Sequence, residues 1–223
     1  MRRTAERTGA RGDIKVLRRE QLIDATMRTI ARRGFARTTM AHVAKAAGLS
    51  QGIVNFYFKT KEALLYETLV HLADEYESLL RQALDEAGPD PVAALDAVIE
   101  TDLGPEVCTP TKVAVWLAFW AESRGRPKYR HLCRKLAEDY FRQVRALCAR
   151  LAEGSGYDET DVENISRSFD SLVNGLWVDM AIDPQSFDRD RARHACRAYF
   201  AGFFPAEFGP LLAAENMNRR RAV

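Results

Sequence analysis

Apolar residues recur at intervals of three and four positions along almost the whole chain, which is the spacing that places them on one face of a helix. Glycine and proline clusters interrupt this pattern, and no segment reads as strand-rich. We therefore expect an all-α protein. The predicted helices cover residues 14–33, 40–47, 51–58, 60–86, 92–103, 111–123, 128–153, 160–182 and 188–203, and the segment from Pro205 to Pro210 is taken as a further break.

The second and third predicted helices are short and are joined by a tight turn. Thr39 is the expected N-cap of the first of them and Ser50 of the next, because their side-chain oxygens accept hydrogen bonds from the free amides of a first helical turn. Gly48 can take the positive φ that such a turn requires. Together with the first helix, these elements predict an N-terminal three-helix domain that contains a helix-turn-helix.

The outer face of the third predicted helix carries amide side chains. Val54 and Phe58 can point inward, while Gln51 and Asn55, four residues apart, share the opposite face. Each amide offers a donor and an acceptor side by side, which suits adenine in the major groove, and Gly52 between them allows close approach to a duplex. The same positions also fit an ordinary helical hairpin with a polar surface. Phosphate contacts are expected from Thr39, Tyr57, Lys59, Thr60 and Lys61.

Charge is distributed unevenly along the chain, although the formal total is only +2. Residues 1–61 contain 14 Lys or Arg against 4 Asp or Glu, a net of +10, whereas the remaining residues contain 19 against 27, a net of −8. Cations gathered at one end favour a localised contact with a polyanion, although a solvated arginine-rich tail has the same composition. We expect a mobile basic arm over residues 1–13, a DNA-binding domain over 14–61 and a helical domain over 62–223.

The run from Thr38 to Leu65, TTMAHVAKAAGLSQGIVNFYFKTKEALL, resembles the signature of the tetracycline-repressor (TetR) family. The resemblance implies a transcriptional repressor that binds an operator in double-stranded DNA and has a C-terminal helical domain for ligand binding and dimerisation. Many members carry tyrosine at the position of Asn55, so the base preference does not carry over. The family pattern assigns Gln51, Gly52, Asn55 and Phe56 to the groove, and Thr39, Tyr57 and Lys61 to phosphates.

A second resemblance lies in the C-terminal half. Segments 112–121 (KVAVWLAFWA) and 171–177 (SLVNGLW), with Pro127, Tyr129 and Arg130 between them, are similar to the choline-responsive BetI subgroup of this family. This resemblance implies an effector such as choline or a related quaternary ammonium. A repressor of the same architecture that answers a lipophilic cation, a fatty acyl compound or a drug is the alternative.

Several aromatic residues are candidates for a ligand cage. Aromatic faces bind a quaternary ammonium through cation–π attraction, and a carboxylate or amide nearby can hold the polar end of the ligand. An aromatic stripe at helical spacing also fits plain hydrophobic core. The candidate ligand residues are Trp116, Phe119, Trp120 and Trp177 for the cage, with Asp170 or Asn174 as the polar anchor.

The last two predicted helices are candidates for a homodimer interface. Each repeats apolar residues at helical spacing, and the two faces could pair across a two-fold axis as a four-helix bundle. A dimer would place two recognition helices on two half-sites of a palindromic operator. The interface candidates are Leu172, Leu176 and Met180 on one helix, and Ala195, Tyr199 and Phe203 on the other.

Other function classes lack their motifs. No Gly-x-Ser-x-Gly, phosphate-binding glycine loop or metal-ligand pair appears, so we expect neither an enzyme nor a cofactor; a helical enzyme is the alternative from another class. The four cysteines contain no Cys-x-x-Cys pair and are expected to be reduced. No apolar run approaches the roughly 18 residues of a membrane span, which favours a cytoplasmic protein without membrane contact.

Overall fold

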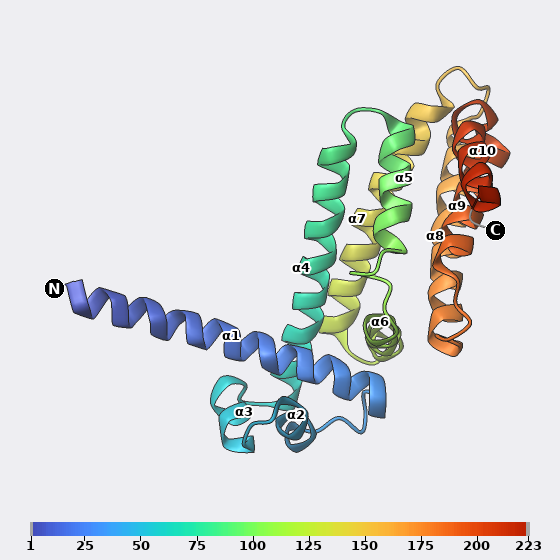
Figure 1. Cartoon of the computed structure of the whole chain (residues 1–223). Coiled ribbons are helices and arrows are strands. Elements are labelled where there is room, and N and C mark those ends of the chain that lie inside the picture. The colour runs from blue at the N-terminus through green and yellow to red at the C-terminus, as the bar shows by residue number, and fades with distance from the viewer. Residues whose placement is uncertain (1, 222–223) are drawn as a thin grey trace. The chain divides into compact units, whose positions relative to one another are not determined.

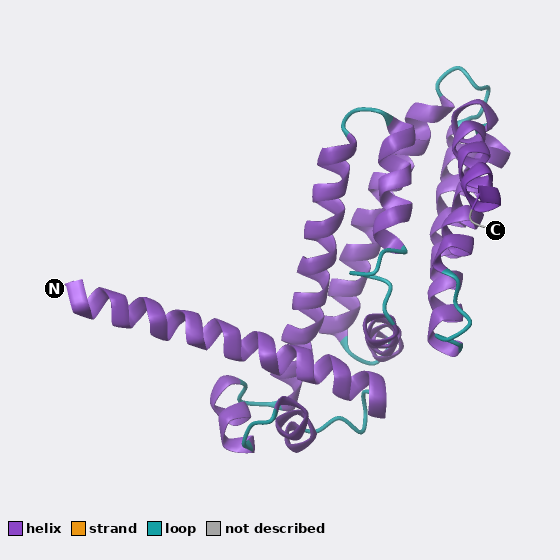
Figure 2. Ribbon diagram, viewed as in Figure 1, coloured by secondary structure: helices purple, strands orange, loops and turns teal. Residues whose placement is uncertain are grey.

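The computed structural model describes residues 2–221, and the side chains of residues 14–214. Within this range all regular structure is helical, which confirms the predicted all-α class (Figures 1 and 2). The helices are α1 (Arg2–Arg33), α2 (Met40–Ala47), α3 (Gln51–Tyr57), α4 (Lys61–Ala87), α5 (Pro91–Asp102), α6 (Pro110–Ser123), α7 (Pro127–Ala152), α8 (Glu159–Ile182), α9 (Arg189–Phe203) and α10 (Pro205–Arg221).

The helices depart from the sequence-based expectation by more than one residue only near the two ends of the chain. α1 begins at Arg2 rather than at Ile14, since helix-favouring Arg, Ala and Glu residues continue the helix in front of the predicted start. The mobility of residues 1–13 stays a prediction. The interpretation of Pro205 to Pro210 as a break is wrong, because Pro205 occupies the first position of α10, where the missing N–H of proline has no helical partner to lose.

The chain forms two compact units. The first comprises Met1–Asp74 and Ala114–Leu132, and the second comprises Glu75–Val113 and Cys133–Val223. The division therefore falls within α4, α6 and α7, whereas the expected domains were separated at Lys61. Local packing explains why part of α6 belongs to the first unit: the Phe119 ring contacts Phe35 and Tyr129 edge to face, at 5.4 Å in both cases.

The core of the first unit is built on one face of α1. Leu22, Ala25 and Ile30 of α1 are at most 2% exposed, as are Val43 of α2 and Val54 of α3. The intervals along α1 match the helical period, so a single apolar stripe packs on α2, and α2 in turn packs on α3. This packing gives α2 and α3 a fixed support.

The core of the second unit is rich in aromatic rings. Phe200 of α9 contacts Phe169 of α8 at 4.6 Å between ring centroids and Phe208 of α10 at 5.1 Å. α9 also packs on α5. There, the Arg197 guanidinium pairs with Asp96 at 2.6 Å and with Glu100 at 2.5 Å. In Figure 1, α5 and α7 lie beside the second half of α4, and α8, α9 and α10 form a further group of helices.

No helix in the described part of the chain is long and apolar enough to cross a membrane. Over the same residues, no group of three or more His, Cys, Asp or Glu side chains is arranged to hold a metal ion. All four cysteines are free thiols.

Candidate nucleic-acid interface and internal ligand site

The turn between α2 and α3 has the geometry that the sequence predicts. Gly48 has φ of 67°, in the left-handed region, and the Leu49 amide donates to the Ala44 carbonyl at 2.9 Å. The Ser50 hydroxyl accepts from the Ile53 amide at 3.4 Å and caps α3. At the start of α2, the Thr39 hydroxyl accepts from the His42 amide at 3.2 Å. The two helices are therefore capped and joined by local hydrogen bonds.

α3 has one buried face and one open face. Val54 is fully buried and Phe58, directly after the helix, is 1% exposed. Gln51 and Asn55 are exposed on the other side, and the Phe56 ring is 68% exposed. The exposed Phe56 ring adds apolar surface beside the two amides, and aromatic residues are enriched at macromolecular interfaces. The open face is therefore suited to a macromolecular partner.

Gly52 lies in the middle of this open face. A Cβ added at Gly52 would meet only the Ser50 hydroxyl, at the ordinary contact distance of 3.7 Å. Because the fold has room for a side chain at this position, internal packing does not account for the glycine. The close approach to a duplex that the sequence predicts for Gly52 stays a prediction.

Two side chains of α1 hold the short helices in place. The Gln21 amide donates to the Ala47 carbonyl at 2.8 Å, next to the α2–α3 turn. The Arg19 guanidinium lies 4.9 Å from the centre of the Phe58 ring and also pairs with Glu67 of α4. Sequence reasoning missed these contacts, since a polar residue on α1 shows no signal that distinguishes a support contact from a solvated position.

Lys61 has partners within the chain. Its ammonium donates to the carbonyl oxygens of Phe35 at 3.4 Å and Ala36 at 3.1 Å, and so ties the start of α4 to the loop before α2. Lys59, two residues earlier, is exposed. The phosphate contact expected of Lys61 stays a prediction, and Lys59 is the more exposed cation.

The second unit contains a buried carboxyl group between two tyrosines. Asp102, the last residue of α5, is 2% exposed. Its Oδ1 accepts from the Tyr76 hydroxyl of α4 at 2.6 Å, and its Oδ2 accepts from the Tyr140 hydroxyl of α7 at 2.7 Å. The Trp177 indole N–H of α8 donates to the Asp102 backbone carbonyl at 3.0 Å. Four helices thus converge on one acidic residue.

Burial raises the pKa of Asp102 to about 7, because the charged form loses its hydration. The hydrogen bonds from Tyr76 and Tyr140 act in the opposite direction, and the charge of Asp170 adds to the rise. Burial likewise raises the pKa of Asp170, whose carboxylate accepts from the Asn174 amide at 3.2 Å. Asp102 gave no signal in the sequence, where it is one acidic residue at a helix end.

Comparison with known proteins supplies the family. Residues 22–68 match the family described as "Bacterial regulatory proteins, tetR family", and residues 91–205, more than half of the chain, match "BetI-type transcriptional repressor, C-terminal". The chain belongs to the TetR family. It is a transcriptional repressor of the BetI type and not an enzyme.

Individual relatives agree with this assignment. The BetI regulator of Ectopseudomonas mendocina is 33% identical over 186 residues, which cover 82% of this chain and 91% of that protein. The BetI regulator of Paraburkholderia xenovorans is 31% identical, over 83% of this chain and 93% of that protein. Among solved structures, a transcriptional regulator from Pseudomonas aeruginosa is 26% identical with a TM-score of 0.73, over 87% of this chain and 93% of that one.

One structural neighbour was crystallised with a ligand. A transcriptional regulator from Saccharomonospora viridis in complex with choline is 21% identical, with a TM-score of 0.69 over 82% of this chain and 95% of that one. At this level of identity the comparison supports the shared fold of this TetR-family chain. The residues that contact choline in the neighbour are not carried over.

The predicted ligand residues of the repressor fall into the two units. Trp116, Phe119 and Trp120 belong to the first unit, where the Trp116 and Trp120 rings lie 6.3 Å apart and Phe119 is fully buried. Asp170, Asn174 and Trp177 belong to the second, where the Trp177 indole is bonded to Asp102. Their contact with a ligand stays a prediction, and sequence reasoning did not include Asp102 or its two tyrosines.

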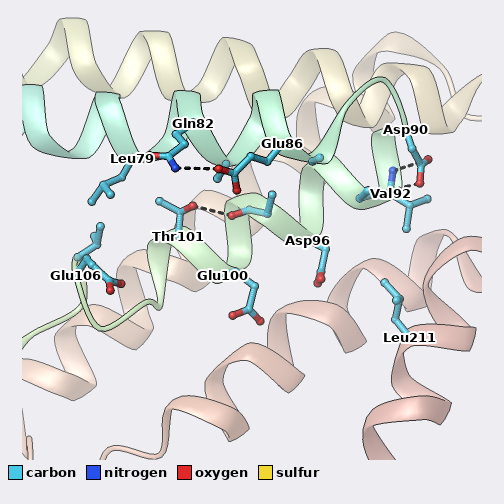
Figure 3. Close-up of a pocket in the computed structure, with 15 residues that line it drawn as sticks. Leu79, Gln82, Glu86, Asp90, Val92, Asp96, Glu100, Thr101, Glu106 and Leu211 are labelled. Atoms are coloured by element: carbon cyan, nitrogen blue, oxygen red, sulfur yellow. Dashed lines mark hydrogen bonds between the residues drawn. The ribbon is translucent and has the colours of Figure 1, made fainter.

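A groove along α4 and α5 of the second unit is a different surface. It has a volume of about 690 Å³ and runs along α4 and α5 to Leu211 of α10. Its lining combines small apolar residues with several carboxylates. Figure 3 shows the Gln82 amide bonded to Glu86 and the side chains of Asp96 and Glu100 directed away from α4. It contains no aromatic ring among its lining residues, so it does not match the chemistry expected of the ligand cage.

The predicted dimer residues lie on the apolar sides of α8 and α9. Leu176 and Ala195 line a groove between these helices, and the Tyr199 hydroxyl donates to the Ile165 carbonyl at 2.8 Å. Met180 is 4% exposed and packs within the chain, whereas Ile182, which sequence reasoning did not select, is 76% exposed. Leu172 and Phe203 are half-buried. The interface itself stays a prediction.

Proposed function

We propose that this TetR-family repressor acts in the cytoplasm as a homodimer on a palindromic operator, and that a small organic cation releases it. The observation that carries the proposal is the open face of α3, where Gln51, Asn55 and Phe56 project from a helix whose other side is locked by Val54. A base-recognition helix needs this combination of free donors and acceptors on a rigid support.

In this proposal, α3 lies in the major groove. Gln51 and Asn55 contact base edges, Gly52 and Phe56 pack against the groove wall, and the cap of α3 at Ser50 fixes the entry of the helix. Thr39, Tyr57 and Lys61 contact phosphates on either side. One helix of this length makes too few contacts for specific binding, so two subunits bind two half-sites.

The dimer contact is proposed on α8 and α9. Two exposed apolar residues of α8, Val178 at 40% and Ile182 at 76% exposure, support a partner on this side. Leu172, Leu176, Ala195, Tyr199 and Phe203 are the further candidates. A two-fold contact between identical α8–α9 pairs would bury these residues.

The effector is proposed to be choline or a related quaternary ammonium. The BetI-type match and the choline complex of the S. viridis regulator support this class of ligand. Asp170, Asn174 and Trp177 in the second unit, and Trp116, Phe119 and Trp120 in the first, remain the predicted ligand residues. Aromatic faces each contribute about 0.5 to 2 kcal/mol to the binding of such a cation.

α4 is proposed to connect effector binding with DNA release. It begins directly after the recognition helix and continues to Ala87, so that residues of both units belong to one helix. Ligand binding changes operator occupancy only if the ligand prefers one of two conformations. A change from 99% to 1% occupancy requires about 5.5 kcal/mol of such preference.

The experiment is a binding titration with the DNA upstream of the protein's own gene, followed by fluorescence anisotropy. Gln51→Ala and Asn55→Ala are each expected to lose about 1 to 3 kcal/mol of preference for this DNA over a shuffled duplex. Gln143→Ala, an exposed amide on α7, serves as the matched control and should bind as the unchanged protein does. Unaltered preference in both α3 variants would exclude the proposed mode of recognition.

A further inference from the structure

Within the described part of the chain, no lysine or arginine pairs with the Tyr76–Asp102–Tyr140 cluster. The groups that shift the pKa of Asp102 are the two tyrosines and Asp170, and none of them is cationic. A buried carboxylate without a counter-ion is unfavourable, and proteins keep such groups where they serve a ligand or a proton. The cluster is therefore a candidate site for a ligand or a proton.

A groove leads to this cluster from the surface. It has a volume of about 440 Å³, lies between α4 and α7, and includes Tyr76 and Tyr140 among its lining residues. Leu80, Leu84 and Leu136 add apolar walls. The rings of Tyr76 and Tyr140 lie 6.5 Å apart, so two aromatic rings separate the groove from the buried carboxyl group.

The rim of the groove does not repel a cation. Lys135 pairs with Asp139 at 2.9 Å and with Glu77 at 3.7 Å, and Arg142 pairs with Asp139 at 2.6 Å. These basic groups are therefore neutralised by neighbouring carboxylates. Asp85 is a further exposed carboxylate on the rim and Arg81 a further exposed cation, so the acidic and basic groups that line the groove balance in formal charge.

We infer that Asp102 is the carboxylate that binds the organic ammonium effector, with Tyr76 and Tyr140 as the aromatic walls and the α4–α7 groove as the entrance. The inference rests on the proposed function, since it names the site at which the effector acts. An alkylammonium head combines positive charge with an apolar surface, and a carboxylate between aromatic rings matches both properties. A neutral ligand of the same shape has the apolar surface but lacks the positive charge.

Binding requires the tyrosines to move, because their hydroxyls occupy both carboxylate oxygens in the free protein. Displacement of Tyr76 acts directly on α4, the helix that follows α3 in the chain. The bonds from Tyr76 and Tyr140 thus hold α4, α5 and α7 together in the DNA-binding state, and the cation exchanges these bonds for its own contacts. This exchange supplies the differential affinity that release requires.

Binding also releases a proton, since the cation binds the ionised form and the carboxyl group is partly protonated in the free protein near its pKa of about 7. About half a proton is released at pH 7 and about 0.9 at pH 6, and affinity falls about tenfold per pH unit below pH 7. Among the described residues, the ionisable groups that interact electrostatically with Asp102 are Tyr76 of α4, Tyr140 of α7, Asp170 of α8, Cys196 of α9, and Cys108 between α5 and α6. Burial raises the pKa values of the two tyrosines and the two cysteines, and so moves them further above this range. It also raises the pKa of Asp170 from 3.8, while Asp102 is the carboxyl group whose pKa reaches about 7.

The test is isothermal titration with choline and with 3,3-dimethylbutan-1-ol, its neutral carbon analogue, in two buffers of different ionisation enthalpy at pH 6, 7 and 8. The full-length protein is expected to bind choline with proton release and to bind the neutral analogue at least tenfold more weakly. Asp102→Asn should weaken choline binding by about 30-fold or more, because one partner of a buried charge pair is lost. Glu153→Gln, which removes an exposed carboxylate directly after α7 and outside the groove, should bind choline as the unchanged protein does.

A second variant keeps the test decisive if Asp102→Asn fails to fold. Tyr76→Phe retains the ring but removes a hydrogen bond that lowers the pKa of Asp102, so binding at pH 7 should release more than half a proton. Choline affinity within threefold of the unchanged protein in Asp102→Asn, or proton release unaltered in Tyr76→Phe, would overturn the inference and leave the proposed repressor function in place. Absence of choline binding by the unchanged protein would overturn both the inference and the proposed cationic effector.

Discussion

At the scale of single residues, Gly52 is a glycine that the packing of the fold does not require. Its position has room for a side chain, because a Cβ added there would lie 3.7 Å from the Ser50 hydroxyl and meet nothing closer. Alanine has the higher helix propensity, by about 0.5 to 1 kcal/mol. A residue that costs the free protein stability without serving its packing is expected to serve a partner.

Gly52→Ala should therefore raise the melting temperature slightly while it weakens operator binding, because the new methyl group holds α3 away from the groove. Thermal unfolding and fluorescence anisotropy measure the two effects. Ala63, an exposed alanine at the start of α4, provides the reverse control: Ala63→Gly should lower stability with operator affinity retained. Operator affinity unchanged in Gly52→Ala would show that the groove does not approach this residue.

Asp102 gives the stability of the protein a specific dependence on pH. Its pKa is raised to about 7 in the folded protein from 3.8, so the native state holds a proton in this range that the unfolded chain has already released. The free energy of unfolding contributed by Asp102 is then highest below about pH 4 and is lost as pH rises toward about 7. Asp102→Asn should flatten this part of the pH profile, whereas Asp85→Asn should not. Parallel profiles of the unchanged protein and Asp102→Asn would contradict the assignment.

At the scale of elements, the α2–α3 turn depends on one backbone conformation. Gly48 has φ of 67°, and a Cβ added there would meet nothing within 4 Å, so any cost of substitution is backbone strain rather than a clash. Gly48→Ala should destabilise the protein by about 1 kcal/mol or more, and Gly48→Asn should cost less because asparagine adopts the left-handed region more readily. Denaturant unfolding measures the free energy of unfolding of each variant and of the unchanged protein. Equal stability of all three proteins would indicate that the turn relaxes.

Local signals explain which elements the sequence could predict. α2 has its predicted bounds and α3 differs by a single residue at its end, because Thr39, Gly48 and Ser50 fix their ends through contacts within a few residues. α10 was not predicted, because a proline such as Pro205 can either follow the end of one helix or occupy the first position of the next. The surrounding packing determines which of the two occurs. Helix periodicity alone could not distinguish these cases.

The internal site shows the limit of such reasoning. Tyr76, Asp102 and Tyr140 are separated by 26 and 38 residues along the chain and meet only through tertiary packing. The pattern indicated Trp177 and Asp170 because they lie on one helix with a recognisable spacing. It contained nothing to show that the Trp177 indole would bond to the end of α5.

At the scale of the whole molecule, charge assigns the DNA contact to one part of the sequence. The first 61 residues carry a net of +10 and the remainder a net of −8, so the two parts interact with phosphates in opposite senses. The carboxylates lining the groove along α4 and α5 belong to the acidic part. We therefore expect non-specific DNA binding in the segment that also holds Gln51 and Asn55.

The most direct test of operator recognition compares two duplexes, the DNA upstream of the protein's own gene and a shuffled sequence of the same composition. Binding is followed by anisotropy at physiological salt, and the mass of the protein and its complex by light scattering. We expect a dimer that prefers the upstream DNA by about a thousandfold or more, as specific DNA-binding proteins do. A monomer that binds both duplexes equally well would contradict the proposed recognition by paired α3 helices.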